Sequence, residues 1–367
     1  AKIQESATLI KALTGHLPAH LMVRRDFPKM NYRVCFEVSE IDQAAWSEFV
    51  YNHPQGNIFQ TPQMFAAYRE DRKYEPLLVV IFDEHNKIDA LLAALIQREG
   101  RGCIGNLTAR SITWGGPLVK NNDPELTAAL LNEYDKIAGE KAIYSQFRNL
   151  WNFGDLKSIF RDRGYIYEDH LNILVDLTRT KEQLWKEIDS KRRNEIRRAE
   201  REGTTVREIN DIAEVEECVA ILRAVYREAA LPFPADSFFS NIYRQLAGKE
   251  YIKFFGAFND NKLIGTMAVF TYKKTIYNWY AGSYKQYYNK YPNDLLPWEV
   301  MLWGKQRGFT IFDFGGAGKP GKAYGVRDYK KKFGGEFYHF GRFEKIHKKY
   351  LYKIGKIGYF FYKYTRR

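Results

Sequence analysis

The residues of this chain that could do chemistry gather toward its C-terminal end. Residues 313–335 read DFGGAGKPGKAYGVRDYKKKFGG, a glycine-rich stretch that begins at the end of a predicted strand, 310–314. Six Lys or Arg residues, one acid (Asp328) and interleaved aromatic residues lie between positions 318 and 332. Ligands bind beyond strand ends in α/β sheets, and cations among aromatic rings suit a phosphorylated or sugar-bearing ligand. We therefore predict that this loop faces a ligand.

A second basic cluster, KRRNEIRR, lies at residues 191–198. We predict one long helix over residues 181–202, which begins with a capping box from Thr180 to Gln183 and is stopped by Gly203. The cations cover more than one face of this helix. They form either a solvated helix surface or a phosphate-binding surface, because arginine holds phosphate oxygens in bidentate fashion.

The composition predicts a folded protein that is drawn to polyanions. Apolar residues make up 45% of the 367 residues, which is enough for a sizeable core. The chain has 57 Lys and Arg against 44 Asp and Glu, a net charge of +13. Nine cations and one acid fall within residues 342–367. Such a charge favours nucleic acid, phosphorylated substrates or an anionic membrane face as partners.

Several chemistries are disfavoured by the sequence. The three cysteines lie far apart, so neither a disulfide framework nor a CxxC site is available. No HExxH motif and no GxSxG motif occurs. We expect no metal, no cofactor and no covalent nucleophile. The longest apolar run, 90–96, is too short to span a bilayer, so we expect a cytoplasmic protein.

The predicted elements occur in the same order in both halves of the chain. The first half contains strand 33–38, helices 42–51 and 62–70, strands 76–82 and 87–97, helix 124–139 and strand 142–147. The second half contains strand 205–209, helices 214–229 and 236–246, strands 251–258, 262–272 and 275–280, helix 295–307 and strand 310–314. Strand 171–177 lies between them. This order predicts a duplicated α/β domain, although two unrelated mixed domains could share it.

These features together resemble the FemABX family of aminoacyltransferases. The likeness covers residues 30 to 343 and rests on LWKEIDSKRRNEIRRAEREG, NWYAGS and FDFGGAGKPGKAYGVRDYKKKFGG. It implies an α/β (α+β) fold of two tandem GNAT-like domains, each a mixed twisted sheet flanked by helices. The long helical arm that some members carry has no counterpart here, so this chain resembles the armless type.

The resemblance also implies the domain organisation. The domains would be 30–177, completed by about 337–367, and 178–336. From the residues themselves, 1–29 would form a leader of uncertain structure, and 342–367 a basic amphipathic segment. Its apolar stripe, formed by Leu351, Ile354, Ile357 and Phe361, would dock on the first domain or lie on a membrane.

The family moves an amino acid from aminoacyl-tRNA to an amino group of a peptidoglycan precursor, which is nucleotide- or lipid-linked. By this resemblance Lys330 matches the essential lysine, and its ammonium would lie near the reacting ester carbonyl. A fixed cation stabilises the oxyanion of direct aminolysis without a covalent enzyme intermediate. We expect a monomer that binds both substrates.

Further site residues follow from the motifs and the resemblance. The predicted substrate-binding residues are Tyr226, Arg227, Trp279, Tyr280, Asp313, Gly315, Gly316, Lys319, Arg327 and Tyr329. The predicted contacts to phosphate or tRNA are Arg192, Arg193 and Arg197.

Two alternative functions remain open at this stage. The first is a GNAT-type N-acyltransferase that uses acyl-CoA on an amino sugar or a small amine. Residues 283–288 lack the glycines of the acetyl-CoA loop, which disfavours that donor. The second is a non-catalytic nucleic-acid-binding protein, which would explain the charge of +13 without any reaction.

Overall fold

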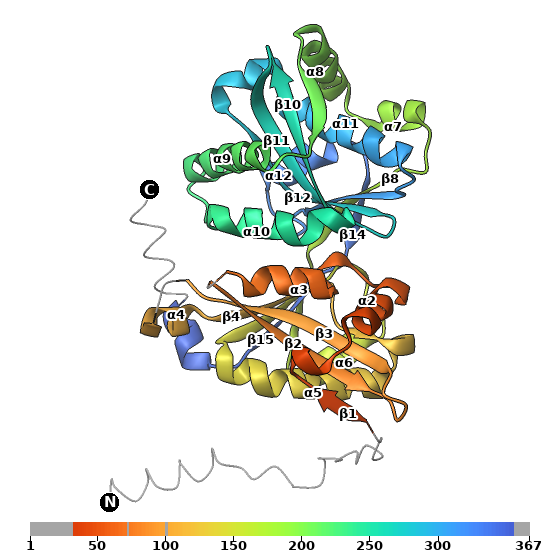
Figure 1. The fold of residues 1–367 in the computed structure, drawn as a ribbon, viewed down its shortest axis with the longest axis vertical. Helices are drawn as coiled ribbons and strands as arrows, with labels where there is room; N and C mark the ends of the chain where they lie inside the picture. The colour runs from red at the N-terminus through yellow and green to blue at the C-terminus, as the bar shows by residue number, and fades with distance from the viewer. Residues whose placement is uncertain (1–31, 72, 100–101, 356–367) are drawn as a thin grey trace, which may run out of the picture. The chain divides into compact units, whose positions relative to one another are not determined.

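The computed structural model describes residues 32–71, 73–99 and 102–355, which form two mixed β-sheets flanked by helices (Figure 1). The first sheet has the strand order β1 (Arg33–Cys35), β2 (Tyr74–Phe82), β3 (Ile88–Gln97), β4 (Arg110–Trp114), β6 (Tyr144–Arg148), β15 (Arg342–Ile346) and β7 (Ile166–Glu168), with β5 (Leu118–Val119) paired to β3. The second has the order β14 (Glu336–His339), β8 (Leu171–Asp176), β13 (Ile311–Gly316), β12 (Thr275–Ser283), β11 (Lys262–Tyr272), β10 (Ile252–Asn259) and β9 (Thr205–Ile209).

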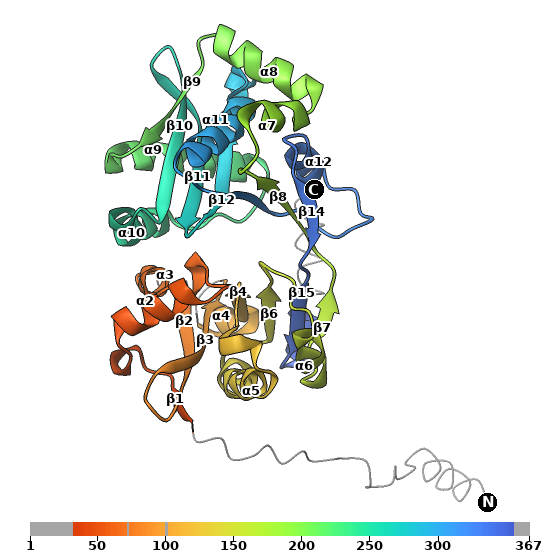
Figure 2. The same cartoon turned by 90° about the vertical axis from the view of Figure 1, so that its right-hand side faces the viewer.

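Each sheet has its own set of helices (Figure 2). Those of the first half are α2 (Gln43–Asn52), α3 (Pro62–Arg69), α4 (Gly102–Thr108), α5 (Pro124–Lys141) and α6 (Leu156–Asp162). Those of the second half are α7 (Lys181–Glu187), α8 (Ser190–Arg201), α9 (Ile212–Glu228), α10 (Asp236–Leu246), α11 (Pro292–Gln306) and α12 (Gly325–Lys331). The predicted fold class is confirmed.

The hairpins β2–β3 and β10–β11 show the duplication most clearly. Their strands are nearly continuous buried apolar runs, as expected for strands covered on both faces. Each hairpin has a register irregularity close to its turn, at Ile81/Phe82 in the first and at Ala257/Phe258 in the second. The same bend therefore recurs in both halves.

The single helix predicted over residues 181–202 is wrong, because the chain breaks there into α7 and α8. Ile188 is buried, and the Asp189 carboxylate accepts the N–H of Lys191 at 3.1 Å, which starts a new helix. The predicted capping box at Thr180 is confirmed as the start of α7. Helix α4 was not predicted from the sequence at all.

The chain passes between the sheets twice. β7 leads into β8, and the returning β14 leads into β15, so that β8 lies in the second sheet and β15 in the first (Figure 2). At this crossing the N–H of Gly341 donates to the carbonyl oxygen of His170 at 3.0 Å. Gly341 has φ +73°, and a β-carbon there would lie 2.2 Å from the Tyr167 ring. Only glycine fits at this position.

The C-terminal segment starts as strand β15 at residues 342–346 and continues as helix over residues 349–355. Ile354 of the predicted apolar stripe is exposed. Ile357 and Phe361 lie outside the described residues, as do residues 1–29. The predicted domain boundaries stay predictions. β8 pairs within the second sheet, and β15 pairs within the first.

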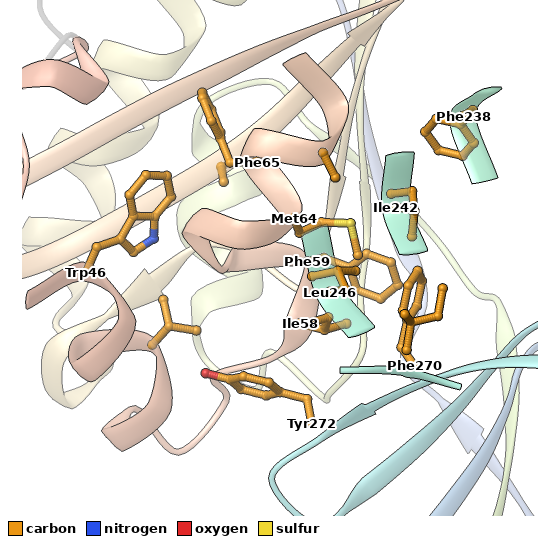
Figure 3. Packing of buried hydrophobic residues seen from close by; sticks show 14 of the residues in the cluster. Trp46, Ile58, Phe59, Met64, Phe65, Phe238, Ile242, Leu246, Phe270 and Tyr272 are labelled. Carbon is orange, nitrogen blue, oxygen red and sulfur yellow. The ribbon is translucent and has the colours of Figure 1, made fainter. Parts of the chain in front are cut away.

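A shared hydrophobic core joins the two halves (Figure 3). Helices α3 and α10 pack side by side. The Phe59 ring, from the first half, lies edge-on to Phe270 of β11 at 5.6 Å. Tyr68 stacks on Phe238 at 5.9 Å. Burial of each such aromatic ring stabilises the fold by roughly 1.5–3 kcal/mol, so the two halves hold each other in place.

Candidate active site

The first cavity, of about 360 Å³, lies between the two halves and is lined by aromatic and basic side chains. It brings together the predicted residues Tyr226, Trp279 and Tyr280. The Tyr226 and Tyr280 rings lie 5.3 Å apart, and the Trp279 and Tyr280 rings 4.8 Å apart. Burial raises the pKa of Tyr226 to about 12, so its hydroxyl stays protonated and can donate a hydrogen bond.

A bulge in β12 explains how neighbouring aromatic residues reach one cavity. Ala268 of β11 pairs with Tyr280, and Val269 pairs with Asn278, which leaves Trp279 as the extra residue. Side chains normally alternate between the faces of a strand, and a bulge re-aims one of them. Trp279 and Tyr280, adjacent in sequence, therefore both line the cavity.

The predicted catalytic Lys330 lies against the end of β13. Its Nζ donates to the carbonyl oxygens of Phe314 at 2.6 Å and of Gly316 at 3.0 Å. Beside it, the buried Asp313 accepts the N–H of Gly315 at 2.6 Å. An ammonium group has three donors, so one N–H remains for a substrate oxygen. Lys330 itself lines neither of the two cavities described here.

Burial shifts the pKa values of both charged groups at this strand end. It lowers the pKa of Lys330 to about 8, against the opposing effect of the Asp313 charge. It raises the pKa of Asp313 to about 6, while the N–H of Gly315, the charge of Lys330 and the Asn172 side chain act in the opposite direction. Lys330 is therefore a cation at neutral pH that loses its proton more readily than a surface lysine.

A second cavity has a volume of about 510 Å³. Asp313 is part of its lining, together with residues 54–59. Tyr277 and Phe59 line both cavities. The phenol of Tyr277 points toward β13, since a β-carbon at Gly315 would lie 3.2 Å from its hydroxyl. Tyr277 therefore lies between the two cavities.

The glycine-rich loop is held by residues that were predicted to bind substrate. Arg327 donates to the carbonyl oxygens of Lys319 at 2.7 Å and of Lys322. Lys319 forms an ion pair with Glu168, and the Tyr329 hydroxyl donates to the carbonyl oxygen of Asn293 at 2.5 Å. In this structure these side chains order the loop and α12. They thereby position Lys330.

The predicted phosphate contacts separate into two groups. Arg192 forms ion pairs with Glu195 and with Asp294 of α11, and Arg193 donates to the carbonyl oxygens that end α7. Both are engaged within the protein. Arg197 is exposed and lies over the Trp185 ring at 5.3 Å. The predicted Arg227 is exposed at the end of α9.

Sequence reasoning missed several polar residues at the crossing of the sheets, namely Arg148, His170, Tyr277 and Arg342. Tyr277 had a usable signal, because it lies two residues before Trp279 on the same strand. The arginines had none, because β6 and β15 are about two hundred positions apart in the sequence. Only strand pairing brings them together.

Within the described residues, no cluster of three or more His, Cys, Asp or Glu could hold a metal ion. The described helices include none that is long and apolar enough to cross a membrane.

Comparison with known proteins agrees with this arrangement. Residues 190–331, which contain most of the second sheet and Lys330, match the family model of the acetyltransferase (GNAT) domain. No curated protein sequence matches the chain. With the duplicated sheets, the match supports an acyltransferase with a tandem GNAT fold, as the sequence predicted.

Solved structures share this fold across nearly the whole chain. FemX aligns at 15% identity over 86% of this chain and 98% of its own, with a TM-score of 0.68. A tandem GNAT protein from the clavulanic acid biosynthesis pathway aligns at 11% identity over 86% and 98%, with a TM-score of 0.55. The C-terminal domain of an Agrobacterium fabrum protein assigned as a lysylphosphatidylglycerol synthetase aligns at 16% identity over 84% and 92%, with a TM-score of 0.53. The predicted resemblance to FemX-type proteins is confirmed at the level of the fold.

Proposed function

We propose that this protein is an aminoacyltransferase that moves an amino acid from aminoacyl-tRNA to an amino group of a peptidoglycan precursor. The observation that carries the proposal is Lys330, a half-buried ammonium held by two carbonyl oxygens at the end of β13, with one N–H left over. This residue is the one that the FemABX resemblance assigns as essential. The likeness of the fold to FemX supports the assignment.

The reaction needs no covalent enzyme intermediate. The acceptor amine attacks the ester carbonyl carbon of the aminoacyl-tRNA, and the carbonyl oxygen becomes an oxyanion. The C–N bond forms, the C–O bond to the ribose breaks, and the proton lost by the amine ends on the ribose hydroxyl. A fixed ammonium near the oxyanion lowers the barrier, and a role of this kind is worth about 10²–10³ in rate. Lys330 supplies that ammonium.

The first cavity, which Tyr226, Trp279 and Tyr280 line and which we call the aromatic cavity, is the proposed site of the acceptor. Tyr226, Trp279 and Tyr280 offer ring faces with polar edges, which suit sugars and nucleobases. The cations Lys73, Arg110 and Arg148 line the same cavity, and its described lining contains no acidic residue. The names of the structural neighbours point to a cell-wall or a lipid acceptor, and the FemABX resemblance favours the cell-wall precursor, nucleotide- or lipid-linked.

The structure around α11 argues against coenzyme A as the donor. In a GNAT domain the pyrophosphate binds backbone amides at the start of the helix that follows β12. Here Pro292 has no N–H, and the amides of Asp294 and Leu295 donate to the carbonyl oxygen of Tyr291. Asp294 also places a carboxylate in this first turn, where it forms an ion pair with Arg192. Few backbone N–H groups are therefore left there for a pyrophosphate.

The donor tRNA would contact the exposed face of α8. Of the arginines there, Arg197 is exposed, whereas Arg192 and Arg193 are engaged within the protein. Lys191, Arg198 and Arg201 are exposed on the same helix. Because aminoacyl-tRNA is cytoplasmic, we propose a cytoplasmic protein, with peripheral membrane contact through the basic segment that follows β15.

The test is incubation of the protein with a mixture of charged tRNAs and a peptidoglycan precursor, followed by mass spectrometry of the precursor. We expect a product heavier by one aminoacyl residue, and no product when the tRNA is digested with ribonuclease beforehand. Absence of any heavier product with every charged tRNA would contradict the proposal.

The family-model match favours a second candidate, an N-acyltransferase that uses acyl-CoA. Calorimetric titration with coenzyme A separates the two candidates. Because few backbone amides are free in the first turn of α11, we expect no measurable heat of coenzyme A binding. Micromolar binding of coenzyme A would favour the second candidate.

A further inference from the structure

Two arginines from different strands of the first sheet face each other at the crossing. Arg148 ends β6 and Arg342 begins β15, and they are direct partners in the antiparallel register. Directly opposed side chains of an antiparallel pair point to the same face and lie close together. Like charges in this arrangement destabilise a sheet. Such a pair needs a compensating reason to persist.

The contacts of the pair within the protein are few. Arg148 Nε donates to the neutral Gln146 amide at 2.9 Å, and its guanidinium lies 4.9 Å from the Trp114 ring centre. No ion pair joins either arginine to a carboxylate among the described residues.

The nearby carboxylates have other partners. Glu344, two residues along β15, accepts from Gln146 at 3.4 Å and from Tyr352 at 2.5 Å. Glu168, which is opposite Arg342 on β7, pairs with Lys319. Neither guanidinium group is therefore tied into an ion pair among the described residues, although the charge of Glu344 acts on Arg342, and Arg148 is the one of the two that lines the aromatic cavity.

Both arginines of the pair are half-buried, and their positive charges act on each other and on His170. Burial, and next the charge of Arg342, lower the pKa of Arg148 to about 10. Burial, and next Arg342, also lower the pKa of His170 to about 4, so this neighbour stays neutral. Arg148 lines the aromatic cavity. A β-carbon at Gly316 would lie 3.7 Å from Arg342 Nη2, which places the pair next to the end of β13.

We propose that Arg148 and Arg342 form a binding site for an oxyanion, a phosphate or a carboxylate group of a ligand that enters the aromatic cavity. Each guanidinium is a planar fork that holds two oxygens of such a group. The Tyr277 phenol, which lines the same cavity, is an additional donor toward the anion. The site needs no particular acyl donor, so it does not depend on aminoacyl transfer.

The test is isothermal titration of the protein with two probes, inorganic pyrophosphate and glutarate, at constant ionic strength set with chloride. We expect the wild-type protein to bind at least one probe. Arg148→Met and Arg342→Met should each weaken that binding about tenfold or more, because each removes a bidentate charge-assisted contact. Arg161→Met, which removes an exposed arginine from α6, is the matched control and should bind as the wild type does.

The outcomes decide the proposal and its chemistry. Tighter binding of pyrophosphate that is lost in both variants assigns a phosphate site, and the same pattern with glutarate assigns a carboxylate site. Wild-type affinity in Arg148→Met and Arg342→Met, or no binding of either probe to the wild type, overturns the proposal. If a methionine variant fails to fold, Arg148→Lys keeps the charge but loses the fork, and it should still weaken binding severalfold.

Discussion

Each of the two sheets contains, within the described residues, one parallel strand pair. The pair in the first sheet ends at a basic residue, and the pair in the second sheet ends at an acidic residue. β4 and β6 end with the register partners Trp114 and Arg148, whereas β12 and β13 reach Tyr277 and Asp313. In both places an aromatic residue lies beside a charged one. The first pair ends in a cation that forms no ion pair with any residue the structure describes, and the second in a buried acid whose charge acts on Lys330. In our two proposals, the first of these ends binds a ligand anion and the second carries the reaction.

The two places differ in the residues that follow the last parallel pair of each sheet. After Asp313 the chain has Gly315, with φ +72°, and Gly316, whose carbonyl oxygen holds Lys330. After Arg148 comes Asn149, whose amide donates to the carbonyl oxygen of Phe340 at 2.9 Å and fixes the crossing. At the end of β13, the carbonyl oxygens of Phe314 and Gly316 hold the Lys330 ammonium. At the end of β6, the residue after Arg148 instead holds the returning chain at Phe340.

The largest expected effect separates the two ends kinetically. Lys330→Ala should lower kcat by about 10²–10³, because it removes a charge that acts on the oxyanion. Arg148→Met should mainly raise KM for the substrate that carries the anion, by about tenfold, because it removes binding to a group that does not react. Steady-state kinetics with each substrate varied in turn measure both effects.

Lys332→Ala, at an exposed neighbouring position, is the control for the loss of a lysine and should react at the wild-type rate. Thermal unfolding checks that each variant is folded. An equal fall in kcat for Lys330→Ala and Lys332→Ala would end the assignment of Lys330.

Asp313 should make stability depend on pH at the second strand end. Its pKa is raised from 3.8 to about 6 on folding, so the folded state holds the proton more tightly than the unfolded state. The stability gained from this group is present below pH 4 and is lost as the pH rises through about 6. Urea unfolding should show a fall in the free energy of unfolding of about 1–3 kcal/mol across this window, by linkage.

Asp313→Asn should remove this fall, because an amide does not titrate and can still accept the N–H of Gly315. Arg148→Met should leave the fall unchanged, because the first strand end has no such acid. A wild-type slope in Asp313→Asn would show that other carboxylates cause it.

The pH profile of the reaction tests Lys330 by its charge. Lys330 has a pKa of about 8, so it loses its proton as the pH rises past 8. Because the oxyanion then has no cation beside it, the transfer rate should fall over the same range. Lys330→Arg retains a cation over the whole range, so its residual activity should not fall there. The measurement is kcat/KM as a function of pH, obtained from initial rates that are corrected for spontaneous ester hydrolysis. The fall of kcat/KM on the alkaline side is the alkaline limb of this profile. A limb at the same pH in both proteins would assign it to a substrate group.

The smallest expected effect concerns the first strand end alone. Arg148→Met removes the repulsion within the arginine pair, so the variant should melt about 2 °C above the wild type in chloride buffer without phosphate. Differential scanning calorimetry measures this shift. A lower melting temperature than that of the wild type would show that Arg148 is a structural residue.

The sequence predicted the local elements well, because their signals are local. Helix 236–246 and the hairpin strand 262–272 follow from apolar periodicity and turn residues. The break at Ile188 was not predictable from the helical pattern, because burial of one side chain decides it. The cavity residues Trp279 and Tyr280 came from a motif. The arginine pair depends on the return of β15 to the first sheet, which no spacing in the sequence reports.

The central claim is that the protein transfers an aminoacyl group from tRNA, with the reaction beside Lys330 at the end of β13. The most direct measurement offers both donors at once, an isotope-labelled aminoacyl-tRNA and acetyl-CoA, to the protein with a peptidoglycan precursor, and weighs the product by mass spectrometry. Our account predicts a product that carries the labelled aminoacyl residue and no acetylated product. A product that carries only the acetyl group would contradict it.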